Sequence, residues 1–462
     1  MQPDLTVTLV DGTRVVVPDD LRRITPYVLL EQGDWFEEEI RFVRAWARPG
    51  FRVLDIGASY GIYTLSLARC AGPGGRVWAV EPGADVAAYL TRGIAANGLA
   101  NVELLPYAIG RADGEGLLTA PYDTERRQLA AAGPGGGQVV TVRTLDRAAQ
   151  DHGIGQVDFV KIDAEGAEAD VLGGGAGFLS RESPLLMLEF KNGSELNEDI
   201  FAPLERRGYA CYRLVPGLNV LVPFYEAEET DPFLLNLFAA KPDRAAALNA
   251  AGFLAAGTPV AAAQPAAPAR VLARIGALPY AHEHAARWAA WFERAPREAH
   301  TRGYAEALGW HALAHDVAAA PDLRVEALER AYALLAEASA SGVAPAVLAS
   351  FVRVAAESGR RKEAMQAGKR LLPLARQQAG DAFAMPLLAP HPYQDGVAPA
   401  DDPAAWLLWS TIEYLETGRA YSSYFSSKLV HRGTGLALDL RYASAALQRR
   451  EELTAKLPPA AQ

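Results

Sequence analysis

A chain of 462 residues, of which 50% are hydrophobic and 22% are charged, is long enough for more than one globular domain and lacks the composition of a disordered protein. Its formal net charge of −10 opposes a general affinity for nucleic acid or anionic lipid, so we expect neither partner. With two cysteines outside any Cys-x-x-Cys pair, no leader-like N-terminus and no apolar run long enough for a membrane span, the protein is expected to be cytoplasmic.

The N-terminal segment predicts a β-hairpin. Two runs rich in β-forming residues, 5–10 and 13–17, flank the turn pair Asp11-Gly12. We assign residues 1–30 to this region. Beyond it, apolar residues recur at helical intervals from Trp35 to Trp46. That helix could cover the mouth of a ligand site or pack on the edge of a sheet, and the sequence leaves both interpretations open.

The next part of the chain alternates β-rich runs with helical stretches, which is typical of a parallel sheet covered by helices on both faces. The expected strands are 52–55, 76–81, 102–105, 157–163, 184–190, 209–215 and 235–239, and the helices between them include 85–97, 167–179 and 195–207. The last two strands could form an antiparallel pair. We therefore predict a doubly wound, mostly parallel, seven-stranded α/β domain over residues 31–254.

The composition changes near residue 255. An Ala/Pro-rich segment, 255–269, predicts a semi-rigid linker. From residue 270 to 462 the chain is rich in Ala and Leu and predicts an all-α domain. A weak internal match between 324–330 and 361–367 resembles a helical repeat of the tetratricopeptide kind, and a Pro-rich insertion, 385–403, interrupts the pattern.

A glycine-rich turn from Asp55 to Gly61 joins the first expected strand to a helix, and this geometry receives nucleotide-like ligands. Asp55 precedes the first glycine, where a carboxylate would accept hydrogen bonds from an amino-acid moiety but would repel a pyrophosphate. Glu81 ends the next strand and suits the hydroxyls of a ribose, whichever cofactor carries it. The position of Asp55 therefore favours S-adenosylmethionine over NAD.

Several motifs together resemble the FkbM family of S-adenosylmethionine-dependent methyltransferases. They are residues 53–64, Val80-Glu81-Pro82, Asn97-Gly98-Leu99, Thr144-Leu145-Asp146 and, most specifically, the block from Asp158 through Lys161-Ile162-Asp163-Ala164-Glu165-Gly166-Ala167 to Glu168. The resemblance covers residues 30–240 and implies the class I, Rossmann-like methyltransferase fold and O-methylation, commonly of a sugar or polyketide-like hydroxyl. Ser59 departs from the Asn that family members often carry, and its hydroxyl can still bind a ligand.

The residues expected to bind S-adenosylmethionine combine the glycine turn with the ends of the following strands. They are Asp55, Gly57, Ala58, Ser59, Gly61, Glu81, Pro82 and Asp163. Lys161 shares one face of its strand with Asp163, and a buried lysine needs a carboxylate partner or loses its charge. We expect Lys161 to pair with Asp163, Glu189 or Asp55, either as a structural ion pair or as a tuned group of the site.

Methyl transfer to an alcohol requires a group that accepts the hydroxyl proton. The candidate bases are Asp163 first, Glu189 second and Glu165 third, because the carboxyl ends of the strands face one crevice. We interpret Glu168 as a first-turn acid that complements the helix dipole. Asp163, Glu165 and Glu189 could instead gather a divalent cation, an alternative that we do not favour.

The sequence thus predicts an S-adenosylmethionine-dependent O-methyltransferase whose catalytic residues are Asp163, Glu189 and Lys161. The resemblance implies a hydroxyl of a saccharide or glycan as the acceptor. A small-molecule natural product or a protein is the alternative acceptor, and a non-catalytic scaffold with a methyltransferase fold is the alternative to an enzyme. The helical domain could recruit a protein partner or the substrate chain.

Overall fold

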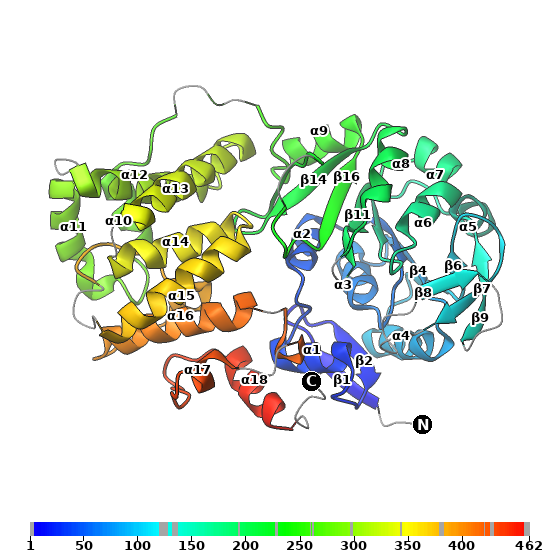
Figure 1. Cartoon of the computed structure of the whole chain (residues 1–462). Coiled ribbons are helices and arrows are strands. Elements are labelled where there is room, and N and C mark those ends of the chain that lie inside the picture. Colours follow the sequence, from blue (N-terminus) through cyan, green and yellow to red (C-terminus); the bar gives the residue numbers. More distant parts are fainter. Residues whose placement is uncertain are drawn as a thin grey trace. The chain divides into compact units, whose positions relative to one another are not determined.

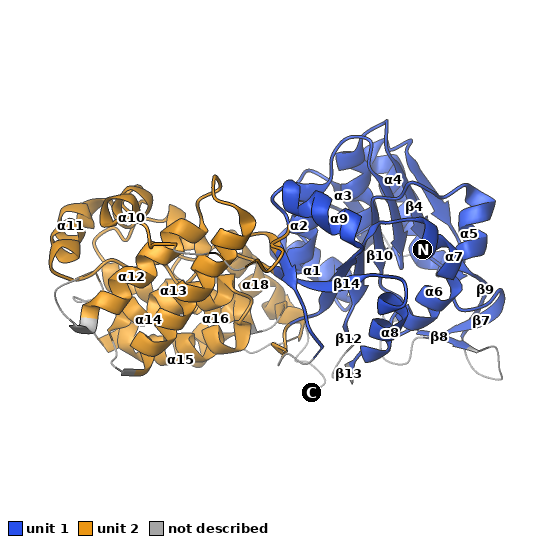
Figure 2. Cartoon of the chain, turned by 90° about the horizontal axis from the view of Figure 1, so that it is seen from above, with its two compact units in different colours: residues 1–214, 221–229, 234–253 blue, residues 215–220, 230–233, 254–462 orange. Residues whose placement is uncertain are grey.

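The computed structural model describes residues 4–119, 128–131, 137–192, 195–226, 230–258, 260, 263–295, 299–341, 344–377, 383–419, 421–425 and 429–456. The chain divides into two compact units (Figure 2). Unit 1 comprises residues 1–214, 221–229 and 234–253, and unit 2 comprises residues 215–220, 230–233 and 254–462. Among the described residues, no helix is both long enough and apolar enough to cross a membrane.

Unit 1 begins with the expected hairpin. Strands β1 (Asp4–Thr8) and β2 (Arg14–Pro18) pair antiparallel and form a sheet of their own. Gly12 has a φ of 81°, and the Thr13 amide donates to Asp11 Oδ1 at 2.8 Å, so the Asp-Gly turn closes the hairpin as predicted. The hairpin lies within unit 1, followed by a helix that we did not expect, α1 (Ile24–Gln32).

The main sheet of unit 1 has eight strands (Figure 1). In spatial order they are β15 (Val220–Pro223), β14 (Ala210–Val215), β16 (Asn236–Ala240), β11 (Leu185–Glu189), β10 (Phe159–Ile162), β3 (Arg52–Ile56), β4 (Arg76–Val80) and β5 (Val102–Leu105). The strands from β11 to β5 are parallel, and β16 is antiparallel to both β11 and β14. The expected doubly wound sheet is present with one strand more than predicted, because the short run β15 extends its edge.

Helices cover both faces of this sheet (Figure 2). One face buries Leu54, Ile56, Val160 and Ile162 in a core that also holds apolar side chains of α5 (Leu145–His152), α6 (Glu168–Gly174), α7 (Ala176–Arg181) and α8 (Phe201–Glu205). On the opposite face, α2 (Glu38–Trp46) packs Phe42 against Phe238 with ring centroids 5.0 Å apart. Because side chains alternate along a strand, Asp55 and Lys161 share this second face with α2 and α3 (Ile62–Ala71).

Two expected helices differ in extent. The helix predicted at 167–179 is split into α6 and α7 at Gly175, where a Cβ would lie 2.6 Å from Leu145. The helix predicted at 195–207 is reduced to a 3-10 turn at Glu198–Ile200 and the short α8, and Gly208, with a φ of 77°, follows it. By contrast, α4 (Ala84–Asn97) agrees with the prediction within one residue. The glycines therefore shorten helices that the apolar pattern alone would extend.

A second, four-stranded sheet lies between β5 and α5, in a region for which the sequence predicted no structure. Its order is β6 (Ala108–Ile109), β9 (Gln138–Arg143), β7 (Gly114–Thr119) and β8 (Gln128–Ala131). It packs around a small core of its own. Residues 120–127 and 132–136 lie outside the described residues. A two-residue hairpin, β12 (Lys191–Asn192) with β13 (Glu195–Leu196), follows β11, and α9 (Pro242–Ala250) follows β16.

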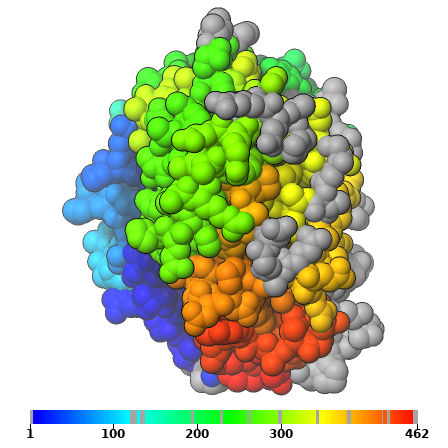
Figure 3. Space-filling view, turned by 90° about the vertical axis from the view of Figure 1, so that its left-hand side faces the viewer, coloured from blue at the N-terminus to red at the C-terminus, as the bar shows by residue number. Residues whose placement is uncertain are grey.

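Unit 2 is helical, as expected. Its helices are α10 (Pro268–Ile275), α11 (Ala285–Arg294), α12 (Ala299–Ala314), α13 (Pro321–Ser341), α14 (Pro345–Glu357), α15 (Arg361–Gln377), α16 (Pro403–Arg419), α17 (Val430–Gly433) and α18 (Ala445–Lys456). From α12 to α16, each helix packs against the next, which is how a helical repeat stacks. Figure 3 shows one surface of the molecule, on which green, orange and red residues of this unit are visible.

The segment predicted as a linker has no helix or strand up to Ala267 among its described residues. It is nevertheless attached to helices of unit 2, since the Ala266 amide donates to the Gly309 carbonyl at 3.1 Å and the Thr258 amide donates to Asp322 Oδ1 at 2.8 Å. The domain boundaries of the sequence analysis stay predictions.

Candidate active site

The turn between β3 and α3 is shaped by hydrogen bonds within the protein. The amides of Gly57 and Ala58 both donate to the Val80 carbonyl at 3.0 Å, and the Gly61 amide donates to Ala58 at 2.8 Å. Gly57 and Gly61 have φ angles of 81° and 88°, and a Cβ on Gly57 would lie 1.9 Å from the Asp163 carbonyl oxygen. The glycine at position 57 is therefore required both by its conformation and by the closeness of β10.

Asp55 lies almost fully buried beneath this turn, 1% exposed. Its Oδ2 accepts a hydrogen bond from Thr64 Oγ1 at 2.6 Å, while Oδ1 has no partner among the described residues. Burial raises the pKa of Asp55, and the nearby Lys161 ammonium opposes that rise. A buried oxygen without a partner is costly, so Asp55 Oδ1 fits a role in accepting hydrogen bonds from a bound ligand.

Glu81, at the end of β4, connects the turn to the start of α4. Its Oε2 accepts from the Ser59 amide at 2.9 Å and its Oε1 accepts from the Gly83 amide at 2.7 Å. Pro82, between these contacts, is partly exposed. Ser59 itself has a positive φ of 49°, which few non-glycine residues adopt. Glu81 therefore fixes the shape of the turn, a function that the sequence analysis did not foresee.

Lys161 forms an ion pair with Asp163 at the end of β10. The Lys161 Nζ lies 2.7 Å from Asp163 Oδ2, and the lysine side chain is only 6% exposed. Burial disfavours the ammonium, but the carboxylates of Asp163, Asp55 and Glu37 outweigh it and raise the pKa of Lys161 above its ordinary value. Of the three expected partners, Asp163 is the one that binds Lys161, and the lysine stays charged.

The start of α2 brings further acids to this place. The Tyr63 hydroxyl donates to Glu37 Oε2 at 2.6 Å, and the Tyr63 ring centroid lies 5.2 Å from Lys161 Nζ. Burial raises the pKa of Glu37, and burial together with the Glu37 carboxylate raises the pKa of Glu39 to about 8. Helix α2 thus packs on the face of the sheet. Glu37, which precedes it, contacts Tyr63 beside Lys161.

Comparison with protein families matches residues 55–211 to the methyltransferase FkbM domain. Unit 1 contains a methyltransferase FkbM domain. The expected resemblance to the FkbM family is thereby confirmed over residues 55–211, and the sheet of unit 1 confirms the expected fold class.

Similar solved structures include three bacterial methyltransferases. A methyltransferase FkbM of Methylobacillus flagellatus is 20% identical, with a TM-score of 0.28 over 41% of this chain and 43% of that one. An S-adenosylmethionine-dependent O-methyltransferase of Thermotoga maritima is 14% identical, with a TM-score of 0.27 over 52% of this chain and 78% of that one. An S-adenosylmethionine-dependent methyltransferase of Aquifex aeolicus is 17% identical, with a TM-score of 0.26 over 46% of this chain and 92% of that one. This chain thus spans less than half of the Methylobacillus protein.

Within the FkbM domain, Glu189 differs from the other strand-end acids. Burial and the carboxylates of Asp163, Glu165 and Glu168 raise the pKa of Glu189 to about 10, so that it holds its proton near neutral pH. Its Oε2 is buried without a partner among the described residues. A protonated carboxyl can donate a hydrogen bond but cannot take up a proton. A pKa raised this far makes Glu189 a poor general base near neutral pH.

The remaining acids of the Asp163 block have separate positions. Glu168 closes the loop before α6, because its Oε1 accepts from the Ala164 amide at 2.8 Å and its Oε2 accepts from Asn197 Nδ2 at 2.6 Å. Glu168 therefore holds the loop in place through these hydrogen bonds, in addition to lying in the first turn of α6, where an acid complements the helix dipole. Glu165, with a φ of 51°, sits at the turn of that loop. In the described part of the chain, Asp163, Glu165 and Glu189 do not bring their oxygens together as a metal-binding group.

The residues missed by sequence reasoning are Glu37, Glu39 and Tyr63. Glu37 lies outside the FkbM domain match, and its position depends on packing of α2 far along the chain from β10. The polar run Glu37-Glu38-Glu39 at the start of an apolar helix was a visible signal, but the sequence analysis assigned it no role. Asn236 also reaches this place, since it pairs in register with Glu189.

Proposed function

We propose that the protein transfers the methyl group of S-adenosylmethionine to a hydroxyl of a saccharide or glycan. The observation that supports this most is the Lys161–Asp163 ion pair, whose aspartate backbone lies directly against Gly57 of the cofactor turn. The Asp163 carboxylate, held there by Lys161, would lie beside the bound cofactor. The acceptor class rests on the family resemblance, and a cytoplasmic location remains a prediction.

The cofactor residues of this proposal are Asp55, Gly57, Ala58, Ser59, Gly61, Glu81, Pro82 and Asp163. When bound, S-adenosylmethionine supplies an electrophilic methyl group on a sulfonium. Asp55 Oδ1, which has no partner in the described part of the chain, would accept hydrogen bonds from the amino-acid moiety of the cofactor. Glu81, which accepts from two backbone amides of the turn, would also accept hydrogen bonds from ribose hydroxyls. Gly57 and Gly61 would let the ligand approach the backbone.

Three residues would act on the acceptor. Asp163 would take the hydroxyl proton as the oxygen attacks the methyl carbon, while the bond from that carbon to sulfur breaks. Lys161 would hold one oxygen of Asp163 in place through the 2.7 Å contact. Glu189, protonated, would donate a hydrogen bond to the acceptor rather than remove its proton. Glu37 and Glu39 would add hydrogen-bonding groups that suit a polyol.

The role of Asp163 is tested by Asp163→Asn, which keeps the shape of the side chain and removes the base. We expect the rate of methyl transfer at saturating S-adenosylmethionine to fall by about 10²- to 10⁴-fold, well beyond any weakening of cofactor binding, to which Asp163 also contributes. Transfer is measured with labelled S-adenosylmethionine on glycan extracts, followed by mass spectrometry of the methylated residue. Asp170→Asn, at an exposed acid of the same loop–helix segment, is the matched control.

Three results of this assay would change the proposal. A rate for Asp163→Asn equal to that of Asp170→Asn would remove Asp163 from the mechanism. Labelled small molecules or proteins, in place of glycans, would replace the proposed acceptor. Cofactor binding without transfer to any acceptor would favour the scaffold alternative.

A further inference from the structure

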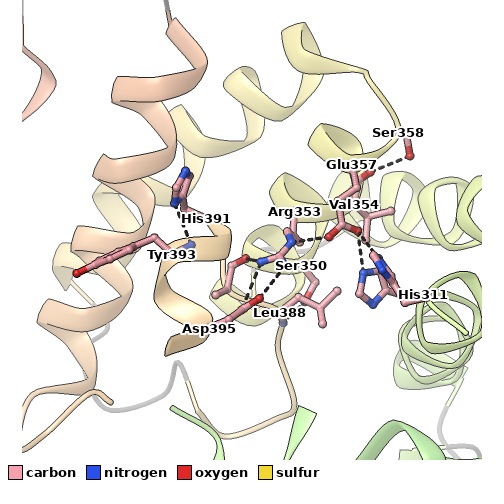
Figure 4. A network of polar contacts seen from close by, with 12 residues as sticks. His311, Ser350, Arg353, Val354, Glu357, Ser358, Leu388, His391, Tyr393 and Asp395 are labelled. Atoms are coloured by element: carbon pink, nitrogen blue, oxygen red, sulfur yellow. Dashed lines mark hydrogen bonds and ion pairs between the residues drawn. The ribbon is translucent and has the colours of Figure 1, made fainter. Parts of the chain in front are cut away.

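Two histidines and one glutamate of unit 2 converge outside the FkbM domain. The Nε2 of His311, in α12, lies 2.8 Å from Glu357 Oε2, and the Nε2 of His315 lies 3.0 Å from the same oxygen. Their ligand atoms all lie within 4.8 Å of one another, and among the described residues this is the only such group of three. Figure 4 shows His311 and Glu357 pointing toward each other from separate helices.

The three side chains lie at or near the C-terminal ends of α12 and α14. His315 directly follows α12, and its amide still donates to the His311 carbonyl at 3.2 Å, so the two histidines lie one turn apart on one face. Glu357 is the last residue of α14, 46 residues beyond His311 along the chain. The group therefore joins the ends of two helices that the long helix α13 separates in sequence.

Glu357 is oriented by groups on its other side. Its Oε1 is 2.5 Å from Arg353 Nε, and Arg353 Nη2 in turn binds Asp395 Oδ2 at 2.8 Å, as Figure 4 shows. The guanidinium is thus shared between two carboxylates, while Oε2 is left to the imidazoles. Gly217 packs closely against the same glutamate, since a Cβ added at Gly217 would lie 2.3 Å from Glu357 Cβ. Partners of this kind hold the ligands of metal sites in place.

The two imidazoles and the carboxylate meet where little solvent reaches, since His311 and Glu357 are 3% and 7% exposed. Without a metal, Glu357 Oε2 can accept a hydrogen bond from each Nε2–H, because a carboxylate oxygen has two lone pairs. Two imidazole nitrogens and one carboxylate oxygen are also a ligand set that Zn²⁺ and similar divalent transition metals bind. A fourth position would remain for water.

We propose that His311, His315 and Glu357 bind one divalent transition-metal ion of the Zn²⁺ type. The ion ties the end of α12 to the end of α14 and stabilises unit 2. It takes no part in methyl transfer, and the site does not depend on the proposed function of unit 1.

The test uses the full chain without a histidine tag, treated with a chelator and titrated with Zn²⁺ against a chromophoric competitor. We expect one ion per chain and a higher melting temperature with Zn²⁺. His315→Ala and Glu357→Gln should each weaken binding by at least about 100-fold and abolish the thermal shift. His282→Ala, at an exposed histidine of the same unit, is the control and should bind as the wild type does.

Glu357→Gln is nearly isosteric and His315 is partly exposed, so these variants are chosen over changes at the buried His311; circular dichroism verifies that they fold. The visible spectrum of bound Co²⁺ supplies a second measurement, because imidazole ligation in a four-coordinate site gives intense absorption that the two variants should lose. The proposal is overturned if the wild type shows no saturable binding, or if the variants bind Zn²⁺ as tightly as the wild type. The three side chains would then form only a hydrogen-bonded packing contact.

Discussion

For Lys161, in β10, the sequence predicted the kind of partner but not which residue supplies it. The sequence required a carboxylate partner for Lys161 and offered Asp163, Glu189 and Asp55. The choice depends on the register in which β10 lies beside β3 and on the side chain's path, and neither can be deduced from the spacing of residues. In the structure, neighbouring carboxylates raise the pKa of Lys161, and burial raises the pKa of Glu189 to about 10.

The protonated state of Glu189 predicts a pH dependence of stability. Its pKa in the folded protein, about 10, lies above the ordinary value of 4.5, so between these values the folded state holds a proton that the unfolded chain has released. The stability that this group contributes is full below the ordinary pKa and is lost as the pH rises toward 10. Glu189→Gln cannot ionise, so it should be more stable than the wild type at pH ~8 and gain little at pH ~5.

Urea denaturation at the two pH values measures this difference. Glu205→Gln, at an exposed acid of α8, is the control and should show no such change with pH. If Glu189→Gln and the wild type keep the same difference in unfolding free energy at both pH values, Glu189 is ionised in the folded protein and regains its place among the candidate bases.

The backbone at Gly57 gives a second prediction at the scale of one residue. Gly57→Ala combines a positive φ with a Cβ 1.9 Å from the Asp163 carbonyl oxygen, so the turn and β10 must separate. Gly98→Ala has a similar φ of 64° and no atom within 4 Å of the added carbon. We expect Gly98→Ala to cost about 1 kcal/mol of unfolding free energy and Gly57→Ala to cost clearly more, as measured by denaturant titration. If both variants lose the same unfolding free energy, the turn at Gly57 can move away from β10 at little cost, which would contradict the prediction.

At the scale of elements, α2 carries the N-terminal acids to the site because its apolar side packs on the sheet. Phe42 is fully buried between Phe238 and Phe253, whose ring centroids lie 5.0 and 5.8 Å away. Phe42→Ala should lower the unfolding free energy by about 3–5 kcal/mol, whereas Arg41→Ala, at a side chain 67% exposed, should stay within about 0.5 kcal/mol. Similar denaturation midpoints for the two variants would contradict this packing.

The elements that the sequence predicted well are those with a strong local pattern. The strands β3, β4, β5, β10 and β11 are short apolar runs bounded by turns, and α4 has a continuous helical pattern between two glycines. The sheet of β6 to β9 escaped prediction because β6 and β8 are very short and β7 contains Gly114 and Gly116, so that these strands gain stability from pairing with one another. The division of α6 from α7 likewise depends on a close approach of Gly175 to Leu145.

In the candidate site too, the sequence predicted what lies in contiguous motifs and missed what depends on tertiary contacts. The glycine turn and the Asp163 block are contiguous motifs, so the sequence located the cofactor residues and the first candidate base. Glu37 and Tyr63 come from other elements and meet Lys161 only through tertiary packing. The cluster of His311, His315 and Glu357 also passed unnoticed, since a His-x-x-x-His pair is common on helices and its acid lies far along the chain.

At the scale of the whole chain, the structure divides into two units of different architecture, and the last segment of unit 2 begins at Leu254. Composition could not show that residues 215–220 and 230–233 are also counted in unit 2. Those assignments depend on contacts such as that of the Gly217 amide with the Glu357 carbonyl at 2.9 Å. Unit 1 contains the methyltransferase domain, and the proposed metal site belongs to unit 2.

The central claim is that the turn from Asp55 to Gly61 holds S-adenosylmethionine. Calorimetric titration of the full chain tests it most directly, with S-adenosylmethionine and NAD as ligands and Asp55→Ala as the variant. We predict saturable binding of S-adenosylmethionine at one site, much weaker binding by Asp55→Ala, and no binding of NAD. Failure of S-adenosylmethionine to bind at millimolar concentration, or binding of NAD in its place, would contradict the account.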